Sequence, residues 1–106
     1  MGKRNRGGYQ MDIFDAEILA FEPFGPIRDE RVRVFLDKFL VTRAEHDCDI
    51  CRHPIPVGSR VRARTEKNPG EGFFGTFYFC AECCEAMGHA QRGNPERFEA
   101  RWAWPK

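Results

Sequence analysis

The stretch CDICRHPIPVGSRVRARTEKNPGEGFFGTFYFCAEC, residues 48–83, opens and closes with a C-x-x-C pair. The two pairs are separated by 28 residues. A two-residue spacer lets both thiolates of a pair reach the same tetrahedral zinc ion at about 2.3 Å. The pattern therefore predicts one structural Zn²⁺ with four cysteine ligands, which are Cys48, Cys51, Cys80 and Cys83.

Disulfide bonds and redox catalysis are the two alternatives for these thiols. A total of five cysteines is odd, which fits poorly with a disulfide framework, and disulfides are rare in the cytosol. A redox-active C-x-x-C normally lies beside a βαβ pattern, which neither pair has. Both alternatives are therefore less favoured than metal binding.

The remaining candidate ligands are one cysteine and three histidines. Cys84 competes with Cys83, because both fall on the same helical face as Cys80. The two-residue spacer favours Cys83, and Cys84 is then expected to be a packed core thiol. Four thiolates complete a tetrahedral shell, so the histidines are expected to lie outside it. They are His46, His53 and His89.

Between the two pairs, the sequence carries the signals of a β-hairpin. Residues 59–65 alternate between polar and apolar side chains, which is typical of a strand. Residues 68–72 form a Pro- and Gly-containing loop, and the aromatic residues 73–79 form the returning strand. Residues 81–91 are expected to form a helix that ends before Gly93.

The segment before the first cysteine pair is divided into an arm and a helical extension. Residues 1–10 are expected to be a flexible basic arm. Residues 11–38 are expected to be helical, with one helix over residues 11–21 and a second from residue 29 to about residue 38. The second helix is ambiguous, because residues 31–34 also alternate like a strand.

The C-terminal residues belong to the predicted zinc-binding module, residues 39–106. Phe98, Ala100, Trp102 and Trp104 alternate, which favours a last strand or an extended segment packed on the aromatic strand. A helix started by Asn94-Pro95 is the alternative.

The order of knuckle, hairpin and C-x-x-C at a helix start resembles the treble-clef zinc finger. The residues that carry the resemblance are Cys48-Asp-Ile-Cys51-Arg-His-Pro-Ile-Pro-Val-Gly58 and Phe77-Tyr-Phe-Cys80-Ala-Glu-Cys83. The pattern is similar to the small treble-clef domains of phages and prophages, over about residues 39–91. The resemblance implies a small α+β fold and, for a phage protein, action in the host cytoplasm. It implies little about activity.

Composition and charge exclude several classes of protein. The chain has 106 residues with a formal net charge of +1, which excludes a histone-like protein and an acidic disordered one. No apolar run approaches the roughly 20 residues of a transmembrane helix, and no apolar stretch follows the basic N-terminus as in a secretory signal. A cytoplasmic protein that does not bind membranes is expected.

An enzymatic activity is not expected. A zinc ion with four thiolate ligands has no open position for water or substrate. Treble-clef nucleases need a catalytic histidine on the hairpin, and residues 59–65 and 73–79 contain no His, Asp or Glu. No small-molecule substrate is expected either.

Nucleic acid is the first expected partner. Arg60, Arg62 and Arg64 alternate along one strand, so they are expected to share a solvated face at about one phosphate spacing. Further basic residues lie in the N-terminal arm, and these are Lys3, Arg4 and Arg6. The alternative is a protein-binding inhibitor or adaptor that attaches to a host protein, because aromatic residues and arginines also anchor protein interfaces.

Overall fold

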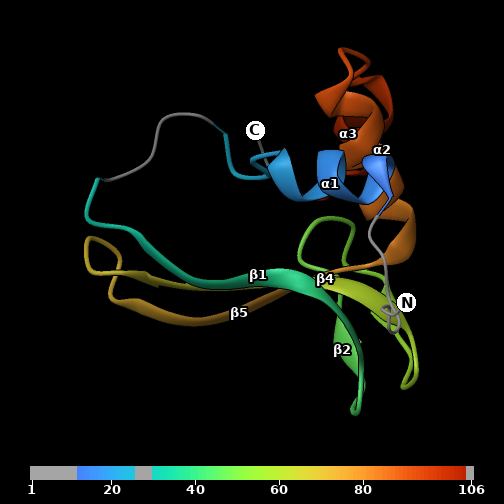
Figure 1. The fold of residues 1–106 in the computed structure, drawn as a ribbon. Helices are drawn as coiled ribbons and strands as arrows, with labels where there is room; N and C mark the ends of the chain where they lie inside the picture. The colour runs from blue at the N-terminus through green and yellow to red at the C-terminus, as the bar shows by residue number, and fades with distance from the viewer. Residues whose placement is uncertain (1–11, 26–29, 105–106) are drawn as a thin grey trace, which may run out of the picture.

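The computed structural model describes residues 12–25 and 30–104, and the predicted small α+β fold is confirmed. The elements follow one another as α1 (Ile13–Ala20), β1 (Arg33–Val41), β2 (His46–Asp47), β3 (Pro54–Ile55), β4 (Arg60–Asn68), β5 (Phe73–Phe79), α2 (Ala81–Gln91) and α3 (Glu96–Arg101) (Figure 1). Among these, there is no helix of the length and apolar character needed to cross a membrane. The predicted arm, with Lys3, Arg4 and Arg6, lies outside the described residues.

The main sheet has three antiparallel strands in the order β1-β4-β5. The hairpin predicted between the cysteine pairs is confirmed as β4 and β5, which pair without interruption from Arg62 with Phe79 to Asn68 with Phe73. The short strands β2 and β3 form a separate two-stranded sheet that contains the first cysteine pair in its turn. The predicted helix over residues 81–91 is confirmed as α2.

The expected helix over residues 29–38 is wrong, because Arg33–Val41 forms strand β1 along the free side of β4. A β-bulge interrupts the pairing between Val34 and Leu36. A bulge brings consecutive side chains onto one face of a strand. The bulge accommodates two consecutive apolar residues, Phe35 and Leu36, in an edge strand. In the sequence, the same two neighbours fit the apolar face of a helix, which is why a helix was predicted.

The three helices lie together over one end of the sheet, and the sheet extends well beyond them (Figure 1). The helix expected over residues 11–21 is confirmed as α1, capped by Asp12, whose side chain accepts from the Asp15 N–H at 2.8 Å. Helix α1 packs closely on α2 at Gly88, where an added Cβ would lie 2.4 Å from the Phe14 ring. A side chain at position 88 would therefore displace α1.

The C-terminal strand favoured by the alternation is wrong, and the alternative helix is present as α3. It follows Pro95, which suits the start of a helix because proline has no N–H to leave unpaired. The helix turns Phe98 inward, to 8% exposure, with its ring 4.9 Å from that of Phe21. Trp102 follows and packs on Phe98, with the ring centroids 5.9 Å apart.

The solvated arginine face expected on β4 is also wrong. Arg62 is fully buried and Arg64 is 7% exposed, and only Arg60 is on the surface. Strand β4 is central in the sheet, and Val61 and Ala63 on its other face are fully buried as well. The alternation therefore separates two buried faces, one apolar and one charged.

The two arginines are buried because each guanidinium is paired. Arg62 donates from Nε and Nη2 to the two carboxylate oxygens of Asp37 on β1, both at 2.8 Å. It also donates from Nη1 to the Ile18 carbonyl oxygen in α1 at 2.8 Å. Arg64 donates to Glu66 at 2.6 Å and to Glu22 at 2.9 Å. These contacts connect α1 and the segment after it to the sheet.

Candidate metal centre

The fold brings the four predicted ligand residues together. The sulfur atoms of Cys48, Cys51, Cys80 and Cys83 all lie within 4.8 Å of one another, and the Sγ atoms of Cys51 and Cys80 are 3.8 Å apart. A tetrahedral zinc ion with Zn–S bonds of about 2.3 Å places its sulfur ligands about 3.8 Å apart. All five cysteines are free thiols. The donor set and its spacing therefore fit a metal site with four sulfur ligands.

Two tight local structures position the sulfur atoms. The first pair lies in the turn between β2 and β3, where Cys48 donates its N–H to the His53 carbonyl and accepts from the Arg52 N–H, both at 2.9 Å. Arg52 closes this turn with a left-handed backbone, at a φ of 69°. The second pair begins α2, with Cys80 as its N-cap residue. A helix start favours thiolates, because its free N–H groups carry positive partial charge.

Backbone N–H groups point at two of the sulfur atoms. The Sγ of Cys48 accepts from the N–H groups of Ile50 and Cys80, each at 3.4 Å, and the Sγ of Cys80 accepts from the Cys83 N–H at 3.4 Å. Such hydrogen bonds to the ligand atoms orient them and stabilise negative charge on sulfur. These three contacts favour negative charge on the sulfur atoms of Cys48 and Cys80.

The thiols of the cluster hydrogen-bond to one another, which shifts their pKa values in opposite directions. Hydrogen bonds from Cys80 and Cys83 lower the pKa of the Cys48 thiol, and donation to Cys48 and then to Cys80 raises the pKa of the Cys83 thiol. Burial raises the pKa of the separate thiol Cys84 to about 12, and its Sγ donates to the Phe79 carbonyl oxygen at 3.3 Å. Cys84 is therefore a neutral core thiol outside the cluster.

Arg101 contacts the cluster, and no sequence pattern indicated it. Its Nε lies 3.0 Å from the Sγ of Cys83, and its Nη2 lies 3.6 Å from that of Cys51 and 3.9 Å from that of Cys80. The contact with Cys83 raises the pKa of the guanidinium. Arg101 is 18 residues beyond Cys83, so no local spacing in the sequence links the two. The one general indication was that a cluster of thiolates is stabilised by a nearby cation.

The histidines lie elsewhere in the described part of the chain. The His46 ring stacks on that of Tyr78 at 3.8 Å, and the His89 ring meets that of Phe14 edge to face at 5.4 Å. His53 is exposed and offers its backbone carbonyl to the turn of the first cysteine pair. None of them belongs to the cluster of possible metal ligands found among the described residues.

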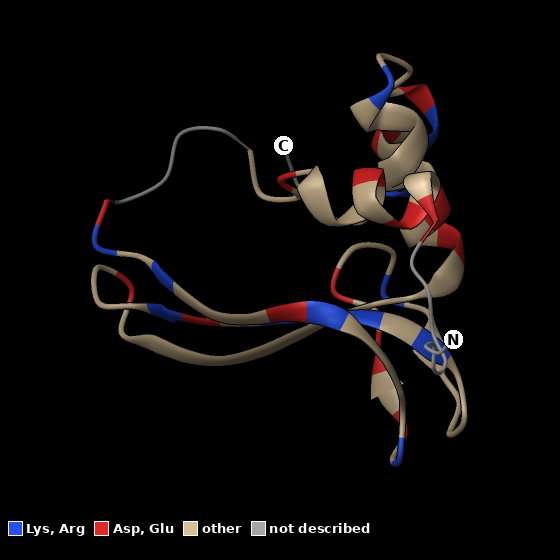
Figure 2. Ribbon diagram, in the orientation of Figure 1, with Lys and Arg blue, Asp and Glu red and all other residues tan. Residues whose placement is uncertain are grey.

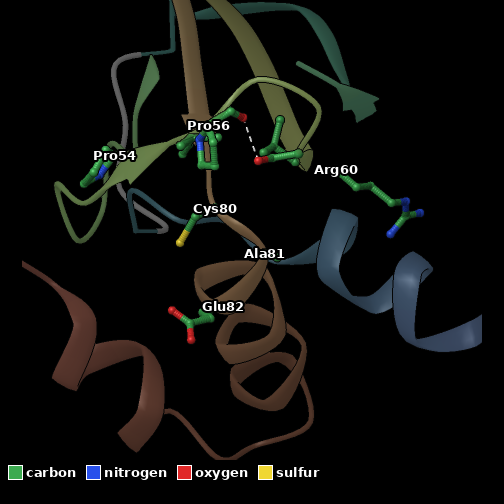
Figure 3. A pocket seen from close by; sticks show the side chains of 9 residues that line it. Pro54, Pro56, Arg60, Cys80, Ala81 and Glu82 are labelled. Carbon is green, nitrogen blue, oxygen red and sulfur yellow. Dashed lines mark hydrogen bonds between the residues drawn. The ribbon is translucent and has the colours of Figure 1, made fainter. Parts of the chain in front are cut away.

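A hollow of about 390 Å³ lies beside Cys80, between β3, the start of β4 and the start of α2 (Figure 3). Its walls are mainly apolar, including Ile55 and Val61, and Arg60 and Glu82 also line it. Arg60 is held from outside by an ion pair with Asp15 at 3.2 Å. Cys80 is the one cysteine of the cluster that lines the hollow.

Comparison of the chain with models of protein families, with curated proteins and with solved structures returns no match. None of the three comparisons therefore supports the phage-type resemblance. The interpretation of the centre rests on its sulfur geometry and on the groups that surround it.

Proposed function

We propose that this chain is a non-enzymatic protein-binding module whose fold is held by one structural Zn²⁺. Cys48, Cys51, Cys80 and Cys83 would hold the ion, which supplies a rigid tetrahedral link between the turn of the first pair and α2. The module is treble-clef-like in this proposal, since a cysteine turn, the β4–β5 hairpin and a helix that begins at the second pair follow in that order.

The absence of catalysis in this proposal follows from the chemistry near the cluster. Four thiolates fill the coordination sphere of a zinc ion and leave no position for a reacting water. The hollow beside Cys80 contains one carboxylate, Glu82, and one guanidinium, Arg60, which is already paired with Asp15. Among its lining residues there is no histidine and no pair of carboxylates to serve as acid and base.

The protein-binding part of the proposal is carried by one observation, a pair of exposed phenylalanines at the far end of the sheet. Phe35 on β1 is 63% exposed and Phe74 on β5 is 68% exposed, and their rings meet edge to face at 5.8 Å. We call these two residues the distal patch. Exposed aromatic clusters of this kind mark interaction surfaces.

The adjoining edge of β5 suits the addition of a strand from a partner protein. The N–H and C=O of Tyr78 face away from β4 and bond to Asp49, so by alternation those of Phe74 and Thr76 also face outward. Edge strands are usually protected by charge or proline, and β5 contains neither (Figure 2). This edge therefore supports recognition of an extended segment.

The charges around the distal patch indicate the character of that segment. Arg33 and Lys67 are direct partners in the β1–β4 register, and both are exposed. Like charges directly opposite each other in a sheet are destabilising. Phe74 is the partner of Lys67 on the other side of β4. An extended segment with apolar residues and an acidic one would cover the aromatic rings and relieve this repulsion.

Nucleic-acid binding through Arg60, Arg62 and Arg64 has less support. The donors of Arg62 and Arg64 are engaged by carboxylates and backbone carbonyls inside the fold, which leaves Arg60 as the accessible member. Its guanidinium lies over the Phe39 ring at 4.0 Å and pairs with Asp15. Binding that weakens steeply with salt and is lost in R60E would favour this alternative.

The distal patch is tested by the variant F35D/F74D. We expect it to lose at least tenfold in affinity for an acidic, apolar peptide selected from a displayed library against the wild-type chain. Both side chains are exposed, so the free energy of unfolding should change by about 0.5 kcal/mol or less for each substitution. Isothermal titration measures the affinity, and urea unfolding checks the stability.

The control is V57D, which places one aspartate at a residue that is 59% exposed in the loop before β4. It should bind the peptide as the wild type does. Hydrogen exchange gives a second measurement, because the bound peptide should protect the N–H groups of Phe74 and Thr76. Equal binding by F35D/F74D and V57D, or a peptide that protects other amides, would contradict the proposal. A dimer by light scattering would assign the edge to a second copy instead.

A further inference from the structure

The C-terminal segment, residues 96–104, lies across the turn that holds the first cysteine pair. Beyond the contacts of Arg101 with three sulfur atoms, the Ala103 N–H donates to the Ile50 carbonyl oxygen at 2.9 Å. The indole Nε1 of Trp104 donates to the Asp49 carbonyl oxygen at 2.7 Å, and the Arg52 guanidinium lies 4.5 Å above the Trp104 ring. Six contacts, three of them from Arg101, thus join residues 101–104 to this turn and to the sulfur cluster.

The charge of the centre gives Arg101 a particular importance among these contacts. Four thiolates and one Zn²⁺ carry a net charge of −2. Arg101 places a positive charge against three of the four sulfur atoms, with its Nε and Nη2 both directed at them. Its fourth contact, with Glu82 at 3.2 Å, is to a side chain that is 79% exposed, and exposed ion pairs contribute little. The thiolates are therefore the main partners of the guanidinium.

Helix α3 needs such an anchor. It has six residues, and helices shorter than about 12 residues are marginal in water without tertiary packing. Phe98 supplies apolar packing at its middle, and Arg101 supplies the contact at its last turn. Residues 102–104 follow directly, so their position on the turn depends on how Arg101 is held.

We propose that Arg101 is a positioning residue of the metal centre, which retains the ion by compensating the thiolate charge and docks the C-terminal segment through the same contacts. The planar guanidinium presents a fork of donors, which a lysine ammonium at the same place cannot reproduce. Groups that hydrogen-bond to metal ligands typically change metal affinity about 10- to 100-fold when they are removed. This inference rests on the metal site of the proposed function.

The test compares R101Q and R101K with the matched control R97Q, which removes an exposed arginine from the same helix. All are loaded with Zn²⁺, and transfer of the ion to a coloured chelator is followed with time. We expect R101Q to lose zinc at least tenfold faster than the wild type, R101K to be intermediate, and R97Q to match the wild type. In the cobalt-loaded chains, R101Q should also move the thiolate-to-metal charge-transfer band, and R97Q should not.

Docking of the C-terminal segment is measured by tryptophan fluorescence in a W102F background, in which Trp104 is the remaining tryptophan. With metal bound, R101Q should shift the Trp104 emission to longer wavelength, and the far-UV circular dichroism should stay close to that of the wild type. A Trp104 shift with unchanged zinc loss and an unchanged cobalt band would overturn the proposal, because Arg101 would then only pack α3. Equal zinc loss in R101Q and R97Q would overturn it as well.

Two further outcomes separate this inference from the metal site itself. A wild-type chain that binds neither Zn²⁺ nor Co²⁺ would overturn the metal site and the role of Arg101 with it. If the wild type binds metal and R101Q does not fold, R101K decides, because it keeps the positive charge and most of the side chain. Zinc loss from R101K at the wild-type rate would then overturn the proposal.

Discussion

Replacement of Cys48 by Ser is expected to abolish stoichiometric zinc binding and to unfold most of the domain. Cys48 is fully buried, its Sγ accepts from two backbone N–H groups, and the residue belongs to the apolar core. Structural zinc sites contribute roughly 10–16 kcal/mol of apparent binding free energy, and whole domains are stable by about 5–15 kcal/mol. Loss of one ligand therefore removes a contribution as large as the entire stability of the fold.

Metal content by mass spectrometry under native conditions and thermal unfolding by circular dichroism measure this result. The matched control is Cys84→Ser, since Cys84 is also buried but donates to the Phe79 carbonyl oxygen outside the cluster. Serine keeps that hydrogen bond, so C84S should retain one zinc ion and a cooperative transition. A C48S chain with full metal and the wild-type Tm, or a C84S chain without metal, would show that the ligand assignment is wrong.

The second large effect is expected at Arg62, where substitution by Met should lower the free energy of unfolding by about 3–5 kcal/mol. The methionine fills most of the space but leaves the Asp37 carboxylate without the two hydrogen bonds it accepts from Arg62. It also leaves the Ile18 carbonyl oxygen of α1 without its side-chain donor. Breaking a buried ion pair by removing one partner typically costs this much, and the Asp37 carboxylate would keep only its longer contact with Arg64, at 3.4 Å.

Urea unfolding measures the change, and R60M is the matched control on the same strand. The Arg60 side chain is 55% exposed and pairs with Asp15 at the surface, so R60M should change the free energy of unfolding by about 1 kcal/mol or less. The pair of variants also separates the two roles weighed for these arginines. A role in phosphate contact predicts that R62M keeps its stability and loses nucleic-acid binding. The buried pairing predicts that R62M loses stability and that any nucleic-acid binding by the folded chain is unchanged.

Local patterns in the sequence were enough to predict the elements nearest the metal centre. The C-x-x-C spacing, the alternation over residues 59–65 and the aromatic run over residues 73–79 each act within a few residues of chain. They anticipated β5 and α2 at their observed bounds and the position of β4 between the two cysteine pairs. Both pairs met in one cluster because the hairpin returns the chain to its starting point.

Strand β1 and the buried arginines could not be predicted in this way. The alternation of polar and apolar side chains in residues 33–41 is interrupted by the bulge at Phe35, so the sequence is compatible with a helix or a strand. The segment is a strand because it pairs with the edge of β4 that β5 leaves open. An arginine that alternates with apolar residues along a strand can face water or pair with a buried carboxylate, and the local sequence does not distinguish the two. Arg62 is buried because β1 brings Asp37 opposite it and α1 lies above it, both from more than 20 residues away.

The sequence by itself thus determined the four cysteines of the cluster, the hairpin and the helix at the second pair, because each depends on spacing within one short segment. The tertiary structure decided which side chains are enclosed and which charges meet. Arg101 is the clearest case, since nothing in ERFEAR distinguishes it from Arg97, an exposed arginine of the same helix. Only the packing of α3 beside the cysteine turn places one of them on the sulfur atoms, because electrostatic attraction acts through space rather than along the chain.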